Sequence, residues 1–376
     1  MSEVDTEKTL QNLLESRKAR RTAPPHTLQT SESIKGSLES FLEANSVPGS
    51  VSAVRRVGGG ASKEQFFFDL VHEGASNTYL LRMDPTEAIT ETDRMREYEI
   101  LHAVADTVPV PQPLWIDSTA THFPREAVIM ECIPGVAKPS DTTEVKVSGL
   151  GTHLGSRLRD GLKQQFLDHL VAIHNFDWRS AKLENFDAPE SDPRQAARWQ
   201  VEYFAELRRQ DDIEHAPITA LTENWLRENL PTCDSPVLVH GDYRTGNFLF
   251  NEETCEITAL LDWELAYIGD FHDDLSWVIQ RVFGTITDGV FRAGDLFERE
   301  EFLTAYEQAS GRTINRDILH FYEVFAAYKC YLFAGVSGLR VAKAVHTHQD
   351  VLLTFLAAAG ALFKSEMCQL LKEERA

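Results

Sequence analysis

The segment that most constrains this chain runs from Val239 to Asp270 and reads VHGDYRTGNFLFNEETCEITALLDWELAYIGD. Two short apolar runs, 248–250 and 257–261, border a polar turn and predict a β-hairpin. Asp and Asn are depleted in strands, and burying an unpaired polar group is costly. Polar side chains nevertheless crowd the ends of both runs, so this hairpin is predicted to carry a working site. These side chains belong to His240, Asp242, Asn247, Asp262 and Glu264.

The spacing of three of these residues suits phosphoryl transfer from ATP. This reaction requires Mg²⁺ against the phosphates and an oriented acceptor hydroxyl, and it asks for little covalent chemistry from the protein. Asp242 is the candidate to accept the hydroxyl proton. Asn247 and Asp262 are the candidate metal ligands, because Mg²⁺ binds a few hard protein oxygens. The gaps are 5 and 15 residues, and a hairpin within the longer gap would bring its two ends together.

The same residues allow other interpretations. Single aspartates are commonly helix N-caps or turn residues. His240 and Asp242 lack a third ligand at a suitable spacing for a metal site. A Ser-His-Asp hydrolase would need a G-x-S-x-G elbow, and the sequence has none. We expect His240 to be structural and assign no role to Glu264, so the phosphoryl-transfer interpretation needs support from elsewhere in the chain.

The N-terminal half contains a candidate phosphate-binding loop. Strands are predicted over 51–57, 65–71 and 78–83, and a glycine-rich segment joins the first two. Glycines allow backbone N–H groups to approach a phosphate closely. Lys63, at the end of this segment, is either a further phosphate contact or a solvated lysine. The candidate phosphate-binding residues of the loop are Gly58, Gly59, Gly60 and Ser62.

A predicted buried ion pair supports this interpretation. Arg82 lies at the end of the third strand, and a helix is predicted over 86–105. Glu97 falls four residues before Leu101, on the face that packs inward, whereas Glu99 falls on the opposite face. Glu97 is therefore the better candidate to pair with Arg82 and so to position the phosphates. The alternative for Glu97 is a solvated helix face.

The remaining pattern divides the chain into lobes. Prolines at 109, 111 and 113 predict a loop, and a further strand is predicted over 127–133. In a two-lobed enzyme that strand connects the lobes, with backbone groups from Glu131 to Ile133 available to an adenine edge. Apolar residues then recur mainly at helical spacing. The predicted fold is α+β, with a flexible N-terminal segment (1–33), a strand-rich lobe (34–133) and a helical lobe (134–376).

Composition narrows the partners and the compartment. The 376 residues carry a net charge of −21, which argues against nucleic acid or an anionic membrane as a partner. The polar N-terminus does not have the pattern of a signal peptide, and the apolar run 351–363 is too short to span a bilayer. Five scattered cysteines have no metal or redox spacing and fit reduced thiols. We expect a cytoplasmic protein, either a monomer or a homodimer.

Taken together, these motifs resemble the aminoglycoside phosphotransferase-like branch of the protein-kinase-like fold over roughly residues 50–345. The specific parts are HGDYRTGNFLF and LLDWELAYIGD. More narrowly, RQAARW, WLRENLP and LDWE resemble a subgroup of kinases found fused to, or beside, acyl-CoA dehydrogenases. The resemblance implies a two-lobed kinase with Asp242 as the catalytic base and with Asn247 and Asp262 as Mg²⁺ ligands.

The resemblance also implies roles outside the hairpin, with one departure. It implies adenine binding by the backbone of Glu131 and Ile133, and structural roles for Asp270 and Asp274. Protein kinases carry a lysine on the third strand, whereas this chain has Arg82, as the subgroup leads one to expect. An arginine can still contact phosphates, but its forked guanidinium has a different geometry.

We therefore expect an ATP- and Mg²⁺-dependent kinase that phosphorylates a hydroxyl group of a small molecule. The acceptor classes are a hydroxyacyl-CoA, an aminoglycoside and a metabolite alcohol. The subgroup resemblance favours hydroxyacyl chemistry, although a fold does not determine a substrate. A catalytically weak, nucleotide-binding regulatory pseudokinase is the alternative, and the missing lysine is its support. A CoA group would want a basic surface, for which the candidates by residue type are Arg157, Arg159, Arg208 and Arg209.

Overall fold

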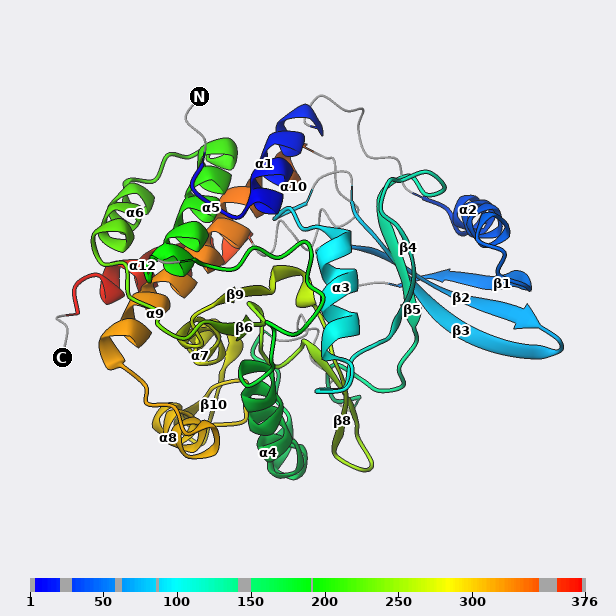
Figure 1. Cartoon of the computed structure of the whole chain (residues 1–376). Helices are drawn as coiled ribbons and strands as arrows, with labels where there is room; N and C mark the ends of the chain where they lie inside the picture. Colours follow the sequence, from blue (N-terminus) through cyan, green and yellow to red (C-terminus); the bar gives the residue numbers. More distant parts are fainter. Residues whose placement is uncertain are drawn as a thin grey trace.

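The computed structural model describes residues 4–20, 29–57, 63–85, 88–140, 150–190, 192–344 and 357–373. A sheet-containing lobe lies on one side of the molecule and a larger helical lobe on the other (Figure 1). The first lobe contains the elements from α2 to β5, and the second contains those from α4 to α12. This is the predicted α+β, two-lobed arrangement.

One antiparallel sheet, with strand order β1-β2-β3-β5-β4, forms the centre of the first lobe. In β2, buried and partly buried side chains alternate along EQFFFDLVH, as expected for a strand with one face on a core. Helix α2 (Ser31–Ala44) covers that core with Ile34, Leu38 and Phe41. The strands are β1 (Ser50–Arg56), β2 (Glu64–His72), β3 (Ala75–Met83), β4 (Pro113–Asp117) and β5 (Ala127–Glu131).

Strand β4 was not predicted, because its prolines indicated a loop. The prediction was wrong from Pro113 onward, where the chain pairs antiparallel with β5 at the edge of the sheet. Proline lacks a backbone N–H and is tolerated at the first position of a strand or at a sheet edge. Pro113 satisfies both conditions.

Helix α3 (Arg94–Val104) begins later than predicted, because Asp93 caps it. The Asp93 carboxylate accepts hydrogen bonds from the backbone N–H groups of Met95, at 2.7 Å, and Arg96, at 3.0 Å. An N-cap residue has extended backbone dihedrals, which Asp93 shows, so the helix cannot continue to earlier residues. The capped start places Glu97 in the first turn, facing β3.

The second lobe is built on long buried helices. Its helices are α4 (Gly155–His174), α5 (Gln195–Asp211), α6 (Pro217–Glu228), α7 (His272–Val278), α8 (Arg299–Ser310), α9 (Arg316–Tyr331), α10 (Leu339–Ala344) and α12 (Gly360–Leu370). A π-helix, Leu332–Gly338, joins α9 to α10. Helix α9 is buried along most of its length and contacts α7, α6 and α12. No helix in the described part of the chain combines the length and the hydrophobicity needed to cross a membrane.

Short strands in the second lobe form the predicted hairpin and its support. Strands β7 (Phe248–Asn251) and β8 (Glu256–Leu260) pair antiparallel, as the two apolar runs predicted. Strand β6 (Val237–Val239), which precedes the hairpin, pairs with β9 (Tyr267–Gly269), which follows it. A further pair is formed by β10 (Thr285–Thr287) and β11 (Val290–Arg292), and two 3-10 turns are η1 (Trp263–Leu265) and η2 (Arg281–Phe283).

The N-terminal segment differs from the flexible segment that was predicted over 1–33. Within residues 4–20 it forms helix α1 (Lys8–Arg20), which lies beside α5 of the helical lobe (Figure 1). Leu14 and Arg17 of α1 are each only 2% exposed. The sequence did not predict this packing, because a buried arginine cannot be told from a solvated one before its partners are known.

Candidate active site

One buried carboxylate, that of Asp274, fixes the loop between β6 and β7. Asp274 accepts hydrogen bonds from the backbone N–H groups of His240, at 2.8 Å, and Gly241, at 2.9 Å. It also bonds Nε2 of His174, at 3.1 Å. Burial alone would raise the pKa of Asp274, but these hydrogen bonds hold it below its usual range. Asp274 thus has the position behind the loop that the resemblance implied.

Gly241 is required at its position in this loop. Its φ is +81°, and a Cβ there would lie 2.5 Å from the carbonyl oxygen of Leu265. The neighbouring His240 is buried, and its Nε2 lies 3.1 Å from the carbonyl oxygen of Leu261. Burial lowers the pKa of His240, although nearby carboxylates oppose the shift, so the ring is neutral near pH 7. His240 therefore links the loop to the end of β8.

Asp242 has one fixed and one open carboxylate oxygen. Its Oδ1 accepts hydrogen bonds from Trp277 Nε1, at 2.7 Å, and from Arg244 Nε, at 2.8 Å. Its Oδ2 has no hydrogen-bond partner among the described residues, and the side chain is 18% exposed. The two donors orient the carboxylate, so the open oxygen has a defined direction. This geometry suits a group that must accept a proton from a bound hydroxyl.

The two candidate metal ligands lie side by side, as their spacing predicted. The backbone N–H of Leu261 donates to the carbonyl of Asn247 at 2.8 Å, which joins the start of β7 to the end of β8. Asn247 Nδ2 donates to the carbonyl of Asp242 at 2.9 Å, leaving its Oδ1 as an available acceptor. Asp262 follows in the left-handed region, with φ at +60°. Asparagine and aspartate tolerate this region better than most residues.

Arg82 connects the first lobe to this hairpin. Its Nη1 lies 2.9 Å from Glu97 Oε1, which is the predicted pair, and its Nη2 lies 2.7 Å from Asp262 Oδ1. Burial would lower the pKa of Arg82, but Glu97 and Asp262 together raise it, so the guanidinium stays charged. The second contact was not predicted. It places a cation from β3 directly against a candidate metal ligand.

A buried charge network next to Arg82 was missed by sequence reasoning. Lys63 is 2% exposed and lies 2.8 Å from Asp84 and 3.3 Å from Glu264. Arg94 contacts the same two carboxylates, at 3.1 and 3.4 Å, and also pairs with Glu97. The expectation of a solvated lysine at position 63 was therefore wrong, whereas the alternative of a phosphate contact stays a prediction. Glu264, to which no role was assigned, joins the hairpin to the first lobe.

One signal in the sequence pointed to part of this network. Arg94 and Glu97 are three residues apart on a predicted helix, a spacing at which side chains meet. Lys63 and Glu264 are about two hundred positions apart in the sequence, and no local pattern relates them. Lys63 and Glu264 meet only because the two lobes pack against each other in the tertiary structure.

The remaining predicted nucleotide-binding residues are less completely described. Gly58, Gly59, Gly60 and Ser62 lie outside the described residues. In the strand that connects the lobes, the N–H of Glu131 already donates to the carbonyl of Gln112 at 3.0 Å. The N–H of Ile133 makes no hydrogen bond within the described part of the chain. Of these two N–H groups, that of Ile133 is thus the one available to a ligand.

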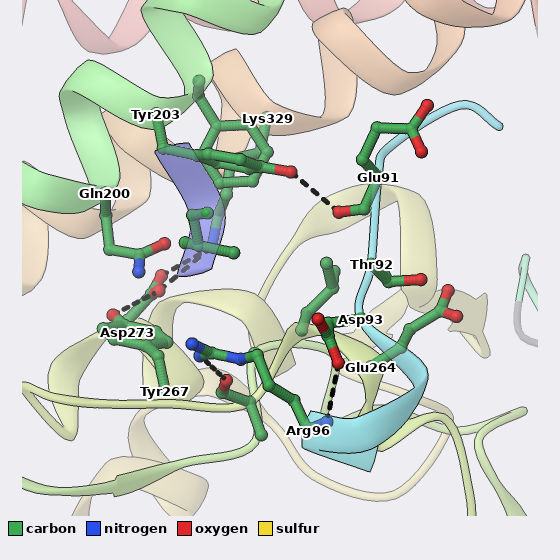
Figure 2. Close-up of a pocket in the computed structure, with 15 residues that line it drawn as sticks. Glu91, Thr92, Asp93, Arg96, Gln200, Tyr203, Glu264, Tyr267, Asp273 and Lys329 are labelled. Carbon is green, nitrogen blue, oxygen red and sulfur yellow. Dashed lines mark hydrogen bonds and ion pairs between the residues drawn. The ribbon is translucent and has the colours of Figure 1, made fainter. Parts of the chain in front are cut away.

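Gly241, which precedes Asp242 in the loop, lines a small cavity whose labelled side chains are mostly charged or polar (Figure 2). The cavity encloses about 30 Å³. Helix α3 contributes Arg96, α5 contributes Gln200 and Tyr203, and α9 contributes Lys329. Asp242, Asn247 and Asp262 do not line it. The cavity therefore lies at the junction of the lobes and is separate from the candidate catalytic groups.

Replacing Trp277 with phenylalanine is expected to lower kcat about tenfold, because a hydrogen bond to a charged group contributes roughly 1.5–3 kcal/mol. The phenyl ring keeps the contact with Phe283 but loses the donor to Asp242. Steady-state kinetics measures the change. Trp199→Phe is the matched control, because its indole donates to the exposed Asp5 far from the loop. Equal rates in both variants would show that Trp277 does not orient the base.

Replacing Glu264 with glutamine is expected to destabilise the protein by roughly 3 kcal/mol at pH 7, because Lys63 and Arg94 lose a buried partner. Burial opposes ionisation of Glu264, but Lys63, Arg94 and Arg82 lower its pKa from 4.5 to about 2. Because the pKa of Glu264 is lower in the folded protein than in the unfolded chain, ionised Glu264 stabilises the fold at pH values above its unfolded-state pKa. This stabilisation is lost as the pH falls through the folded-state pKa. The difference between wild type and variant should therefore shrink below about pH 4.5.

Chemical unfolding at a series of pH values tests this dependence. Glu300→Gln, which removes the exposed pair with Arg316, is the control and should cost less than about 1 kcal/mol. A difference for Glu264→Gln that stays constant down to pH 3 would contradict the assigned ion pairs.

Comparison with protein-family models connects this geometry to known proteins. Residues 53–319, more than half of the chain, match the model of the phosphotransferase enzyme family. Acyl-CoA dehydrogenase family member 11 of Gallus gallus is 27% identical over 326 residues, which cover 81% of this chain and 39% of that protein. A probable acyl-CoA dehydrogenase of Arabidopsis thaliana, IBR3, is 23% identical over 303 residues, which cover 75% of this chain and 36% of that protein. The chain thus spans less than half the length of these curated relatives.

Solved structures share the fold. A candidate aminoglycoside phosphotransferase from Ralstonia eutropha JMP134 superposes with a TM-score of 0.65 at 22% identity, covering 90% of this chain and 98% of that one. Aminoglycoside phosphotransferase APH(4)-Ia, in a ternary complex with AMP-PNP and hygromycin B, has a TM-score of 0.57 at 17% identity over 90% and 99% of the two chains. Both the fold and the predicted subgroup are confirmed, and the chain belongs to the phosphotransferase enzyme family.

Proposed function

We propose that this chain transfers the γ-phosphoryl group of ATP, with Mg²⁺, to a hydroxyl group of a small molecule. The observation that supports this most is the meeting of two sets of residues from different lobes. The oriented carboxylate of Asp242 lies on the same hairpin as Asn247 and Asp262. Arg82, fixed by Glu97, reaches Asp262 from the other lobe. Positioning and electrostatic stabilisation, rather than covalent chemistry, account for most of phosphoryl transfer.

The donor set at the hairpin fits Mg²⁺. Asn247 Oδ1 and Asp262 Oδ2 are two hard oxygens on adjacent strand ends, and neither accepts a hydrogen bond from a described residue. No group of three His, Cys, Asp or Glu side chains in the described ranges is arranged to bind a metal. Mg²⁺ commonly binds through one or two protein oxygens together with water and nucleotide phosphates. When bound, the ion would neutralise charge on the phosphates.

The protein groups then have separate tasks. Arg82 would contact the phosphates while Glu97 maintains its direction. The N–H of Ile133 would bind the adenine edge. Asp242 would orient the acceptor hydroxyl through Oδ2 and take its proton as the new O–P bond forms and ADP leaves with its electron pair. Because Oδ1 is occupied by Trp277 and Arg244, the proton has one carboxylate oxygen to go to.

Among the three acceptor classes we favour a hydroxyacyl-CoA or a similar hydroxy acid. The acyl-CoA dehydrogenase names of the relatives are one reason. The second is Arg244, whose guanidinium lies beside Asp242 and over the ring of Phe283, at 4.9 Å. An aminoglycoside is a cation, and a cationic side chain next to the catalytic base would oppose its approach. A carbonyl or carboxylate oxygen near the hydroxyl would be attracted instead.

The predicted arginines for a CoA group do not form a ready surface. Arg157 donates to the carbonyl of Glu252 at 2.6 Å, and Arg159 pairs with Asp295 at 2.8 Å. The other two arginines lie on α5, where Arg208 pairs with Glu223 and Arg209 with Glu206. Each of the four arginines already has a partner, so the structure gives no support to their proposed role in binding a CoA group.

An ADP-release assay tests the proposed function. Hydroxyacyl-CoAs, aminoglycosides and small alcohols are supplied with MgATP, and the product is examined by mass spectrometry. Matched acyl-CoAs without the hydroxyl are the controls. Hydroxyl-dependent ADP release with a phosphorylated product supports the proposal. Tight nucleotide binding without release across the panel would contradict it and favour the regulatory alternative.

A further inference from the structure

The N-terminal segment Val4–Arg20 contacts both lobes next to the candidate active site. Glu7 and Arg17 are 1% and 2% exposed, although charged groups are rarely buried unless paired. Both are paired with residues far away in the sequence, and the partners belong to different lobes. A segment that merely precedes the catalytic unit would not need buried charges of this kind.

Glu7 fixes helix α3 through Arg96. Arg96 Nη1 lies 2.6 Å from Glu7 Oε2, and Arg96 Nη2 donates to the carbonyl oxygen of Ala266 at 3.0 Å. The bond to Ala266 reaches the segment that follows Asp262. Arg96 is also the residue before Glu97. One guanidinium therefore joins the N-terminal segment, the helix that carries Glu97 and the chain that leaves the metal-binding hairpin.

Arg17 fixes the residues that lead into α3. Its Nη1 and Nη2 bind both oxygens of Asp211, at 2.8 and 2.7 Å, at the end of α5. Its Nε lies 3.1 Å from Glu91, and Nη2 also donates to the carbonyl of Ala88 at 3.3 Å. A bidentate arginine–carboxylate pair is directional as well as strong. Arg17 thus joins the helical lobe to the strand–helix connection of the first lobe.

The cavity of Figure 2 lies among these contacts. Leu10 of α1 lines it together with Glu91, Arg96 and Gly241. Tyr203 of α5 donates to the carbonyl of Glu91 at 2.8 Å across the same space. The cavity leaves this junction incompletely filled beside Arg96 at the start of α3. The directional ion pairs of Glu7 and Arg17 therefore fix the start of α3 and the residues before it, in addition to the apolar core that holds Leu101 and Val104.

We propose that the segment Val4–Arg20 positions the nucleotide site, with Glu7 and Arg17 as positioning residues. Through Arg96 and Glu91 they hold α3 in the place where Glu97 keeps Arg82 against Asp262. Lobes of one chain move relative to each other by default unless a large interface prevents it. Here an N-terminal segment whose Leu14 packs in the core of the helical lobe supplies that restraint through its ion pairs to the first lobe. The inference rests on the proposed nucleotide role of Arg82.

The first test compares two substitutions on the same segment. Glu7→Gln is expected to raise the Kd for MgATP about five- to twentyfold, a usual size for coupling between neighbouring sites. It should also speed amide hydrogen exchange in α3. Asp5→Asn is the matched control, because it removes an exposed ion pair with Arg198 at 2.6 Å and does not contact α3. The control should change the Kd less than twofold, and unchanged Kd and exchange in Glu7→Gln would overturn the proposal.

A double-mutant cycle separates positioning from general stability. In an Arg82→Met background, Glu7→Gln should change the Kd for MgATP less than about twofold, because its effect passes through Arg82. If Glu7→Gln raised the Kd for MgATP by the same factor in the wild type and in Arg82→Met, the proposal would be overturned. If Glu7→Gln does not fold, Arg17→Lys replaces it as the test variant. Arg17→Lys keeps the positive charge but loses the bidentate geometry, and it should raise the Kd for MgATP severalfold. If the wild type binds no nucleotide, the proposed function fails, and exchange in α3 alone decides whether the segment positions that helix.

Discussion

Replacing Asp242 with asparagine is expected to reduce kcat roughly a thousandfold, within the range of about 10²–10⁴ that a general base contributes. The amide can still accept hydrogen bonds from Trp277 and Arg244 through Oδ1, so the loop should keep its shape. It cannot take a proton at the open position. The Kd for MgATP, measured without acceptor, should change little, because Asp242 does not contact Asn247 or Asp262 through its carboxylate.

Rates and binding are measured on the same preparations, with Asp160→Asn as the control. Asp160 is exposed on α4, and its substitution should leave both quantities at wild-type values. A wild-type rate in Asp242→Asn would show that another group accepts the proton. A large loss of nucleotide affinity would show instead that Asp242 belongs to the nucleotide site.

Replacing Asp262 with asparagine is expected to lower kcat on the order of a hundredfold, because a bound divalent ion stabilises the transition state by several kcal/mol. The substitution weakens the metal site and also removes one of the two carboxylates that Arg82 contacts. The Mg²⁺ concentration required for half-maximal activity should therefore rise, by about tenfold or more.

Titration with Mg²⁺ distinguishes this variant from the previous one. Excess Mg²⁺ should restore part of the activity of Asp262→Asn, since Asn247 and the nucleotide phosphates still offer oxygen ligands. It should restore none in Asp242→Asn, where the proton acceptor is missing. An unchanged Mg²⁺ requirement in Asp262→Asn would contradict its role as a ligand.

The sequence allowed the hairpin of the candidate site to be predicted, because the pattern that specifies a hairpin lies within one short stretch of sequence. The two apolar runs and the polar turn between them indicated β7 and β8, and the pairing of those strands brings Asn247 next to Asp262. Helical periodicity likewise placed Glu97 on the face that meets Arg82. In both cases, a regular element converts spacing along the chain into a direction in space.

Other features could not be predicted, because their information is not local. The start of α3 at Arg94 depends on the Asp93 cap, and β4 begins in a proline-rich stretch that indicates a loop. The burial of Lys63 depends on Glu264, about 200 positions away, and that of Arg17 depends on Glu91 and Asp211, 74 and 194 positions away. A lysine or arginine in such a sequence is as compatible with solvent as with a buried pair. Arg17 was therefore included in a segment predicted to be flexible, and no buried ion pair was predicted for Lys63.

The sequence by itself determined the candidate site of this chain: an aspartate, an asparagine and a second aspartate at hairpin spacing, with an arginine–glutamate pair to face them. The tertiary structure decided how that site is held. It joined Arg82 to Asp262, enclosed Lys63 and Arg94 with Glu264, and paired Glu7 of the N-terminal segment with Arg96 of α3. Spacing specifies geometry within a regular element, whereas an ion pair between lobes forms only where the complete fold removes both charges from water.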